Sequence, residues 1–206
     1  MKISIITVCL NSEDTILHTL NSVLTQTYDN IEHIIVDGGS TDRTRNFLQK
    51  YNFKRKKIIF KKKLSLYNSI NLGIKESSGD IITILHSDDI YNRPNTIESV
   101  IKKIKKSKKK IFLGDVIYYK NDFKNIIRYY SSKNFRISLM KFGFMPPHTG
   151  SFYRKKVFKN IGYYKNFKIA GDFEHMLRAF YKKKYEFEIL NIITTRMRTG
   201  GLSSKN

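Results

Sequence analysis

Short apolar runs rich in β-branched residues alternate with longer amphipathic segments through the first half of the chain. The runs predict strands at residues 3–10, 31–36, 58–60 and 81–85. The amphipathic segments predict helices at residues 13–24, 42–51, 65–76 and 95–106, with Ser12 as the N-cap of the first and Pro94 opening the last. Strands that alternate with helices form a mostly parallel sheet, because each parallel pair needs a crossover connection.

The pattern of the second half is less regular. It predicts strands at residues 110–119, 126–130, 149–153 and 187–194, and helices at residues 155–161 and 172–183. Two of the three prolines fall in residues 142–148, which we interpret as a loop. We find no internal repeat and no clear linker, so we expect a single domain over residues 1–206.

Composition narrows the class of protein. The 40% hydrophobic content supports a folded core, and the single cysteine, Cys9, excludes an intramolecular disulfide framework and suits a reducing cytoplasm. The apolar run at residues 3–10 is short and is followed by polar and acidic residues, so we interpret it as the first strand and not as a signal peptide. No run approaches the ~20 apolar residues that span a bilayer.

The formal net charge of +22 needs a partner or a compositional explanation. Much of it lies in two clusters, Lys54 to Lys63 and Lys102 to Lys110. Clustered cations bind nucleic acid, and they also bind the anionic cytoplasmic face of a membrane, where each Lys or Arg adds roughly 1 kcal/mol. An AT-rich genome also produces such lysine-rich sequences, and their lysines then only solvate the surface. The composition leaves all three explanations open.

Two adjacent aspartates, Asp88 and Asp89, follow the apolar run at residues 81–85. In open α/β sheets ligands bind outside the carboxyl ends of the strands, which is where this pair falls. Neighbouring carboxylates repel each other unless a cation holds them, and a divalent ion with oxygen ligands does so and can bridge the phosphates of a nucleotide. The alternative is a pair of turn-forming aspartates that end the strand.

The turn Asp37-Gly38-Gly39-Ser40 also follows a predicted strand. Asp37 is placed to accept hydrogen bonds from the base or sugar of a nucleoside, although a plain strand-to-helix turn explains the same residues. The chain has neither the G-x-G-x-x-G fingerprint nor a Walker Gly-Lys-Ser/Thr sequence.

Asp172 is predicted at the start of a helix, where the helix dipole favours a charged carboxylate that serves either as a cap or as a general base. Arg178 lies at i+4 from Glu174 and can pair with it, which leaves Asp172 free. His148, between Pro147 and Thr149, is a candidate metal ligand or proton relay, with a structural role as the alternative.

Several motifs occur in order along nearly the whole chain, at residues 3–12 (ISIITVCLNS), 22–28 (SVLTQTY), 31–32 (IE), 35–42 (IVDGGSTD), 79–89 (GDIITILHSDD), 114–116 (GDV), 148–154 (HTGSFYR), 169–178 (IAGDFEHMLR) and 197–203 (MRTGGLS). Together they resemble the motifs of family 2 glycosyltransferases with the A-type fold, in particular the bacterial subgroup that builds capsule, O-antigen and related polysaccharides. The resemblance implies an α/β fold whose mostly parallel, Rossmann-like sheet is flanked by helices. It also implies a nucleotide-sugar half at about residues 1–115 and an acceptor half at about residues 116–206.

The resemblance assigns a role to each matching position. Asp172 is expected to be the catalytic base of an inverting transfer, and Asp89 and His148 the ligands of manganese or magnesium. The nucleotide-sugar donor is expected to contact Val8, Asn11, Asp37, Asp88 and Arg178. The expected acceptor is a growing cell-surface glycan or a lipid-linked glycan, met at the inner face of an anionic membrane by a cytoplasmic or peripheral protein. No nucleic acid is expected as a partner.

The chain departs from the family pattern at three places. Gly38 stands where relatives often carry a second acid, and Lys63 and Ser65 stand where they usually have an Asp and a Gly shortly before the residue matching Tyr67. Relatives commonly continue beyond the residues matching Ser203, which would leave part of the acceptor site or a membrane contact outside this chain. These departures keep two alternatives open: a catalytically degenerate homologue of the same fold, and a basic nucleic-acid-binding protein suggested by charge alone.

Overall fold

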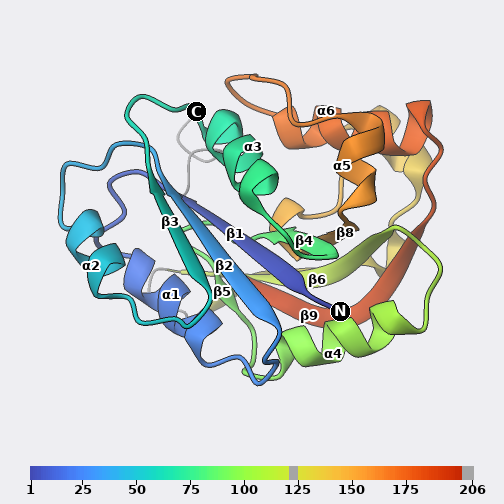
Figure 1. The fold of residues 1–206 in the computed structure, drawn as a ribbon. Coiled ribbons are helices and arrows are strands. Elements are labelled where there is room, and N and C mark those ends of the chain that lie inside the picture. The colour runs from blue at the N-terminus through green and yellow to red at the C-terminus, as the bar shows by residue number, and fades with distance from the viewer. Residues whose placement is uncertain (121–124, 201–206) are drawn as a thin grey trace.

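The computed structural model describes residues 1–120 and 125–200, in which one curled sheet carries helices on both faces (Figure 1). Its strands are β1 (Ile3–Cys9), β2 (Ile31–Asp37), β3 (Lys56–Phe60), β4 (Ile81–Ile84), β5 (Ile90–Tyr91), β6 (Ile111–Tyr119), β7 (Ile126–Tyr130), β8 (Ser151–Arg154) and β9 (Phe187–Arg198). They are ordered β3-β2-β1-β4-β8-β6-β9-β5, and β7 pairs with β6.

Most strands of the sheet, namely β1, β2, β3, β4, β6 and β9, point in the same direction. β3, β2, β1 and β4 are parallel to one another, and β6 is parallel to β9. β8 lies antiparallel between β4 and β6, while β5 and β7 pair antiparallel with β9 and β6. The predicted α/β fold with a mostly parallel sheet is therefore confirmed. Strands of the predicted nucleotide-sugar and acceptor halves share this sheet, and the division into halves stays a prediction.

Helices cover both faces of the sheet. The helical segments are α1 (Ile16–Leu24), α2 (Thr44–Lys50), α3 (Leu66–Glu76), α4 (Thr96–Lys105), α5 (Lys156–Ile161), α6 (Gly171–Leu177), the short turns η1 (Ser132–Asn134), η2 (Ile137–Phe142) and η3 (His148–Gly150), and the π-helical turn η4 (Arg178–Lys182). α3, α5 and α6 lie on one face, and α1, α2 and α4 lie on the other (Figure 1).

The alternation of side chains along a strand explains why the apolar runs are continuous. In β1, Ile6 and Val8 pack toward α3, whereas Ile3 and Ile5 pack into the cluster beneath α4. Both sides of the strand are buried, so both are mainly apolar, and the buried hydroxyls of Ser4 and Thr7 are hydrogen-bonded. The same two-sided burial makes β4 and β2 mainly apolar, and their polar side chains, Thr83 in β4 and Glu32, His33 and Asp37 in β2, are hydrogen-bonded.

The first helix begins three residues later than predicted, and Ser12 does not cap it. α1 starts at Ile16, and its N-cap residue Thr15 makes no side-chain cap bond. The backbone N–H groups of Ser12 and Glu13 instead donate to Thr44 Oγ1 (2.8 Å) and Asp42 Oδ2 (3.1 Å). The segment between β1 and α1 therefore holds the loop after β2, a long-range contact that a local capping pattern cannot reveal.

Other differences lie in the second half of the sequence. The helix predicted at residues 172–183 is α6 followed by the π-helical turn η4, and the last strand continues to Arg198 instead of ending at Thr194. This continuation pairs with β6 and with the unpredicted two-residue strand β5. Pairing with β6 and β5, which lie far away in the sequence, keeps this segment in the sheet. Its own Thr and Arg residues do not form a pattern that predicts a strand.

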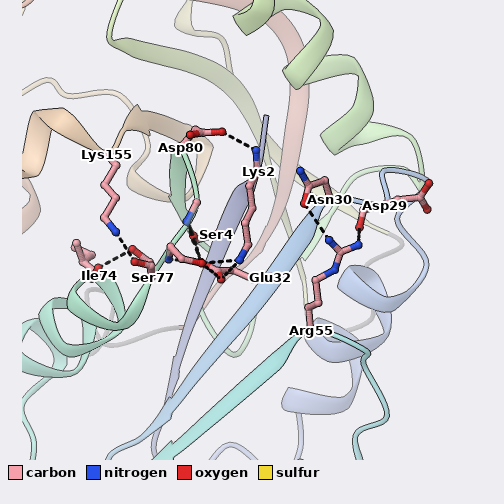
Figure 2. Close-up of polar contacts among 12 residues, drawn as sticks. Lys2, Ser4, Asp29, Asn30, Glu32, Arg55, Ile74, Ser77, Asp80 and Lys155 are labelled. Carbon is pink, nitrogen blue, oxygen red and sulfur yellow. Dashed lines mark hydrogen bonds and ion pairs between the residues drawn. The ribbon is translucent and has the colours of Figure 1, made fainter.

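The amino-terminal edge of the sheet is held by a network of polar contacts (Figure 2). The Glu32 carboxylate pairs with Lys2 Nζ (2.5 Å) and accepts hydrogen bonds from the Ser4 hydroxyl and from the backbone N–H groups of Ser78 (2.5 Å) and Gly79 (3.0 Å). These partners come from β1, β2 and the turn before β4. The network therefore fixes where three parallel strands start.

Most residues of the two lysine clusters lie at this same amino-terminal edge. Lys54 to Lys57 lead into and begin β3, and Lys106 to Lys110 join α4 to the start of β6. Only Lys61 to Lys63 lie beyond the carboxyl end of β3. Within residues 1–120 and 125–200, no helix has the length and apolar composition needed to cross a membrane.

Candidate active site

A cleft of about 910 Å³ lies at the carboxyl edge of the parallel strands. Its lining comes from the ends of β1, β4, β6 and β9, the turn after β2, and α3 with the residues before it. Four of the predicted site residues line it, namely Val8, Asn11, Asp88 and Asp89. The other four, Asp37, His148, Asp172 and Arg178, are outside its lining.

Asp89 is the most unusual carboxyl group in the cleft. The side chain is 2% exposed, and its Oδ1 accepts one hydrogen bond from the Arg198 backbone N–H (3.3 Å). Its Oδ2 is buried without a hydrogen-bond partner. Burial, and secondarily the charge of Asp88, raise the pKa of the Asp89 carboxyl well above its usual range. An unpaired buried oxygen of this kind is costly unless a cation or proton occupies it.

The loop that carries the two aspartates is tied to α1. Thr19 Oγ1 donates to the carbonyl oxygen of Asp89 (2.8 Å), and the hydroxyls of Ser12 and Ser87 lie 2.9 Å apart. Desolvation lowers the pKa of His86, while the charges of Asp88 and Asp172 act in the opposite direction. His86, which lines the cleft, therefore lies within electrostatic reach of both Asp88 and Asp172.

Asp37 is fully buried beneath the glycine turn. Its Oδ1 accepts hydrogen bonds from the N–H groups of Gly39 (2.8 Å) and Ser40 (2.8 Å), an arrangement that shapes the turn. Gly38 lines the cleft directly. The geometry therefore shows a turn-forming role for Asp37, and its contact with a nucleoside stays a prediction.

Asn11 and Val8 line the cleft at the end of β1. Asn11 has a φ of 49°, and its Oδ1 accepts a hydrogen bond from the Thr41 N–H (2.9 Å). Its backbone N–H donates to Ser40 Oγ (2.9 Å). Asn11 thus joins the loops after β1 and β2, which form one wall of the cleft. Donor contact by either residue stays a prediction.

Asp172 sits in the first turn of α6 and is held by a tyrosine from α3. Tyr67 Oη donates to Asp172 Oδ1 (3.2 Å) and accepts from the Gly171 N–H (2.8 Å). A Cβ at Gly171 would lie 2.7 Å from the Tyr67 ring, so only glycine permits this approach. Asp172 is half-buried, and its Oδ2 appears in no described hydrogen bond. The arrangement leaves Asp172 able to accept a proton.

Arg178 is occupied by the protein itself. Its Nε donates to both carboxylate oxygens of Glu174 (2.8 and 3.0 Å), and its two terminal nitrogens donate to the carbonyl oxygens of Ile161 and Tyr163. Burial opposes the change, but hydrogen bonds from Arg178 and Lys165 lower the pKa of Glu174. The predicted Glu174–Arg178 pair is present. The structure does not bring Arg178 to the cleft, because it clamps α6 to the segment after α5.

His148 is buried, and its Nε2 lies 2.7 Å from the Tyr164 hydroxyl. Burial lowers its pKa to about 4, and its ring lies 5.8 Å from that of His86. Among the described residues, no group of three or more His, Cys, Asp and Glu side chains could hold a metal ion, so His148 does not join the two aspartates as a third ligand. The hydrogen bond with Tyr164 occupies the Nε2 atom of His148. The geometry therefore favours a structural role for His148.

Some residues of the site were missed from the sequence. Tyr118 of β6 and the segment Met197 to Gly200 line the cleft, and the Arg198 backbone holds Asp89. The sequence pattern predicts that the last strand ends at Thr194, so it does not place these later residues in the sheet. The motif at residues 197–203 nevertheless includes them. Its last part, residues 201–203, lies outside the described residues. The sequence indicates Tyr67 only through its match to the family pattern.

Comparisons with known proteins agree with this fold. The sequence model of "Glycosyl transferase family 2" matches residues 4–162, so the chain belongs to that family. An uncharacterized glycosyltransferase of Mycobacterium tuberculosis is 30% identical over 186 residues, which cover 86% of this chain and 68% of the relative. An uncharacterized glycosyltransferase of Haemophilus influenzae is 35% identical over 108 residues, which cover 51% of this chain and 33% of the relative.

Solved structures share the fold. Staphylococcus aureus TarS 1-349 in complex with UDP-GlcNAc superposes with a TM-score of 0.78 at 21% identity, covering 100% of this chain and 61% of TarS. The mannosyltransferase PcManGT of Pyrobaculum calidifontis, in complex with GDP-Man and Mn²⁺, gives a TM-score of 0.73 at 13% identity, covering 98% of this chain and 58% of that enzyme. The expected A-type glycosyltransferase fold is confirmed. This chain spans a third to two thirds of the length of these four proteins.

Proposed function

We propose that this chain transfers a sugar from a nucleotide-sugar donor to a hydroxyl group of a glycan or lipid-linked acceptor, with inversion at the anomeric carbon. The observation that carries the proposal is the Asp88–Asp89 pair, which follows the parallel strand β4 and lines the cleft with one buried oxygen unpaired. A site of this kind suits a ligand that brings a cation and phosphates. Membership of glycosyl transferase family 2 supports the reaction class.

Asp88 and Asp89 are the residues that would hold a divalent cation. The unpaired Asp89 Oδ2 fits such a group, because carboxylate oxygens are the ligands that magnesium and manganese prefer. The absence of a third protein ligand in the described residues also fits, since magnesium is commonly bound by one or two carboxylates together with substrate phosphates. A bound cation would supply charge neutralisation at the diphosphate leaving group.

Asp172 is our candidate for the general base. In the proposed step its carboxylate takes the proton of the acceptor hydroxyl while that oxygen forms a bond to the anomeric carbon. The bond from this carbon to the diphosphate oxygen breaks, and its electron pair leaves with the nucleoside diphosphate. One displacement from the opposite face inverts the carbon. Tyr67 keeps the carboxylate oriented through its bond to Oδ1.

Nucleotide binding tests the proposal. We would titrate UDP, GDP and CDP into the protein by calorimetry, with Mn²⁺ or Mg²⁺ and then with a chelator. One of the three should bind in the presence of metal and bind much more weakly without it. The corresponding nucleotide sugars should then release their nucleoside diphosphate when an acceptor is added. If no nucleoside diphosphate binds under any metal condition, the proposal is wrong.

A specific observation keeps the degenerate homologue as a second candidate. Lys63 replaces the usual family acid and has a φ of 59°, and Ser65 replaces the usual glycine and caps α3 through a bond from the Asn68 N–H (3.4 Å). Leu64 and Leu66, beside these positions, line the cleft. Metal-dependent nucleotide binding without any turnover of the matching nucleotide sugars would favour this candidate.

A further inference from the structure

Exposed apolar side chains are concentrated in one part of the chain. Of the thirteen large apolar side chains that are exposed in the described residues, eight fall between Ile126 and Ile169. Isolated exposed apolar residues are ordinary on a soluble protein, but a local concentration indicates an interaction surface.

Two elements carry five of these side chains. Ile126, Ile127 and Tyr129 are more than half exposed on β7, and Phe142 and Phe144 are 77% and 58% exposed on the turn after η2. The Tyr130 hydroxyl at the end of β7 donates to the Met145 carbonyl oxygen (2.9 Å), which ties the strand to the turn. We call these five side chains, with the cations among them, the β7–turn surface.

The turn holds its two phenylalanines outward on a fixed backbone. The N–H groups of Gly143 and Phe144 donate to the carbonyl oxygens of Met140 (3.1 Å) and Leu139 (3.3 Å). Gly143 has a φ of 81°, and a Cβ built on it would meet nothing within 4 Å. This is a helix end of the left-handed type, so the exposure of Phe142 and Phe144 is a property of an ordered turn.

The charged residues of this segment have one sign, and the acid that contacts the surface, Asp115 of β6, is buried and accepts a hydrogen bond from the Tyr129 hydroxyl (2.5 Å). Residues 123–171 contain eleven Lys and Arg residues and no Asp or Glu. Arg128, Lys133, Arg136 and Lys141, which belong to the β7–turn surface, are all exposed. Aromatic and aliphatic side chains interleaved with cations match the boundary of an anionic lipid bilayer, where apolar groups enter the acyl region and cations stay among the headgroups.

The β7–turn surface adjoins the cleft. Arg128 pairs with Tyr118 across β7 and β6, and its guanidinium lies 5.9 Å from the centre of the Tyr118 ring. Tyr118 lines the cleft. By contrast, most of the Lys54–Lys63 and Lys102–Lys110 clusters lie at the opposite edge of the sheet (Figure 1), where Arg55 contacts Asp29 and Asn30 (Figure 2). A membrane held by those clusters would face away from the cleft.

We propose that the β7–turn surface docks on an anionic lipid bilayer and so holds the cleft at the membrane surface. This deepens the proposed function, because it explains how the cleft would meet a lipid-linked acceptor. The docking itself needs neither the donor nor turnover, so it can be tested separately.

Vesicle flotation tests the proposal. We would measure binding to phosphatidylcholine vesicles with and without phosphatidylglycerol, at low and at high salt. The wild type should bind the anionic vesicles, and the double variant Phe142→Ser/Phe144→Ser should bind them about tenfold more weakly or worse. Lys133→Gln/Lys141→Gln should weaken binding and reduce its salt dependence.

Two matched variants serve as controls. Leu17→Ser/Leu24→Ser removes exposed apolar side chains of α1, and Lys102→Gln/Lys106→Gln removes cations of α4 and of its C-cap position; both should bind vesicles like the wild type. Metal-dependent nucleotide binding should be unchanged in every variant, which separates failure of docking from failure of the proposed function. Folding is checked by thermal unfolding.

Three results would overturn docking by this surface. The first is equal binding of the wild type to neutral and anionic vesicles, or binding to neither. The second is loss of vesicle binding in the α4 variant with full retention in the phenylalanine variant. The third is a wild-type dimer in sedimentation that the phenylalanine variant converts to a monomer, which would assign the surface to a second copy of the chain.

Discussion

Carboxylates at the two edges of the parallel sheet have opposite environments. At the amino edge, Glu32 is 12% exposed and is surrounded by donors from Lys2, Ser4, Ser78 and Gly79 (Figure 2). Burial opposes the change, but these partners lower its pKa to about 2. At the carboxyl edge, Asp89 is buried with one oxygen unpaired, and its pKa is raised.

The difference separates stability from binding. A saturated carboxylate stabilises the folded chain, because its partners favour the charged form. An unsaturated buried carboxyl costs stability and persists where a ligand completes it, as expected at a functional site. Changes at the carboxyl edge should therefore reduce activity, and changes at the amino edge should reduce the free energy of unfolding.

The largest effect is expected at Asp172. Asp172→Asn keeps the shape of the side chain and removes its basicity, so turnover should fall about 10²–10⁴-fold with nucleotide affinity nearly unchanged. Release of nucleoside diphosphate from the donor measures the rate, and calorimetry measures the affinity. Glu174→Gln is the control, because Glu174 is paired with Arg178 and Lys165. Near wild-type turnover in Asp172→Asn together with a large loss in Glu174→Gln would reverse the assignment.

Asp89→Asn should weaken metal-dependent nucleotide binding by about a hundredfold, since a cation on the diphosphate contributes several kcal/mol. The metal-free variant should melt at a higher temperature than the wild type, because an amide avoids the cost of the buried charge. Thermal unfolding in a chelator checks the second result. A variant that binds the nucleotide with the wild-type metal response would contradict the metal site.

Glu32→Gln should lower the free energy of unfolding by about 2–3 kcal/mol, because several hydrogen bonds to a charged group are lost in a mostly buried position. Glu76→Gln is a matched control, because Glu76 pairs with Lys57 on the surface, where an ion pair contributes about 0–1 kcal/mol. Urea denaturation measures both. Equal effects in the two variants would show that the amino-edge network is no more important than a surface pair.

The smallest effect is a pH dependence. The pKa of Glu32 is about 2 in the folded chain against an ordinary value of 4.5, so its contribution to stability is complete above pH 4.5 and is lost as the pH falls toward 2. The stability difference between the wild type and Glu32→Gln should therefore shrink over this interval. A difference that stays constant between neutral pH and pH 2 would mean that the charge of Glu32 is not its source.

The sequence by itself determined the elements whose signal is local. The mainly apolar runs of β1, β2 and β4 indicated a sheet buried on both faces, and the Asp88–Asp89 pair after one run indicated the edge of the sheet that carries the cleft. The ordered family motifs led to the fold class. These inferences succeed because both features produce a local sequence pattern. A strand buried on both faces is a short apolar run, and a residue at its carboxyl end follows that run directly.

Only the tertiary structure decided which candidate side chains are available. Asp37 shapes its own turn, Arg178 clamps α6, and His148 is bonded to Tyr164, so residues with similar motif support have different positions. The tertiary structure also extended β9 to Arg198, whose backbone holds Asp89, and delayed α1 because Thr44 and Asp42 bind the segment before it. Each of these contacts joins residues far apart in the chain, and such contacts form only when the sheet brings its strand ends together.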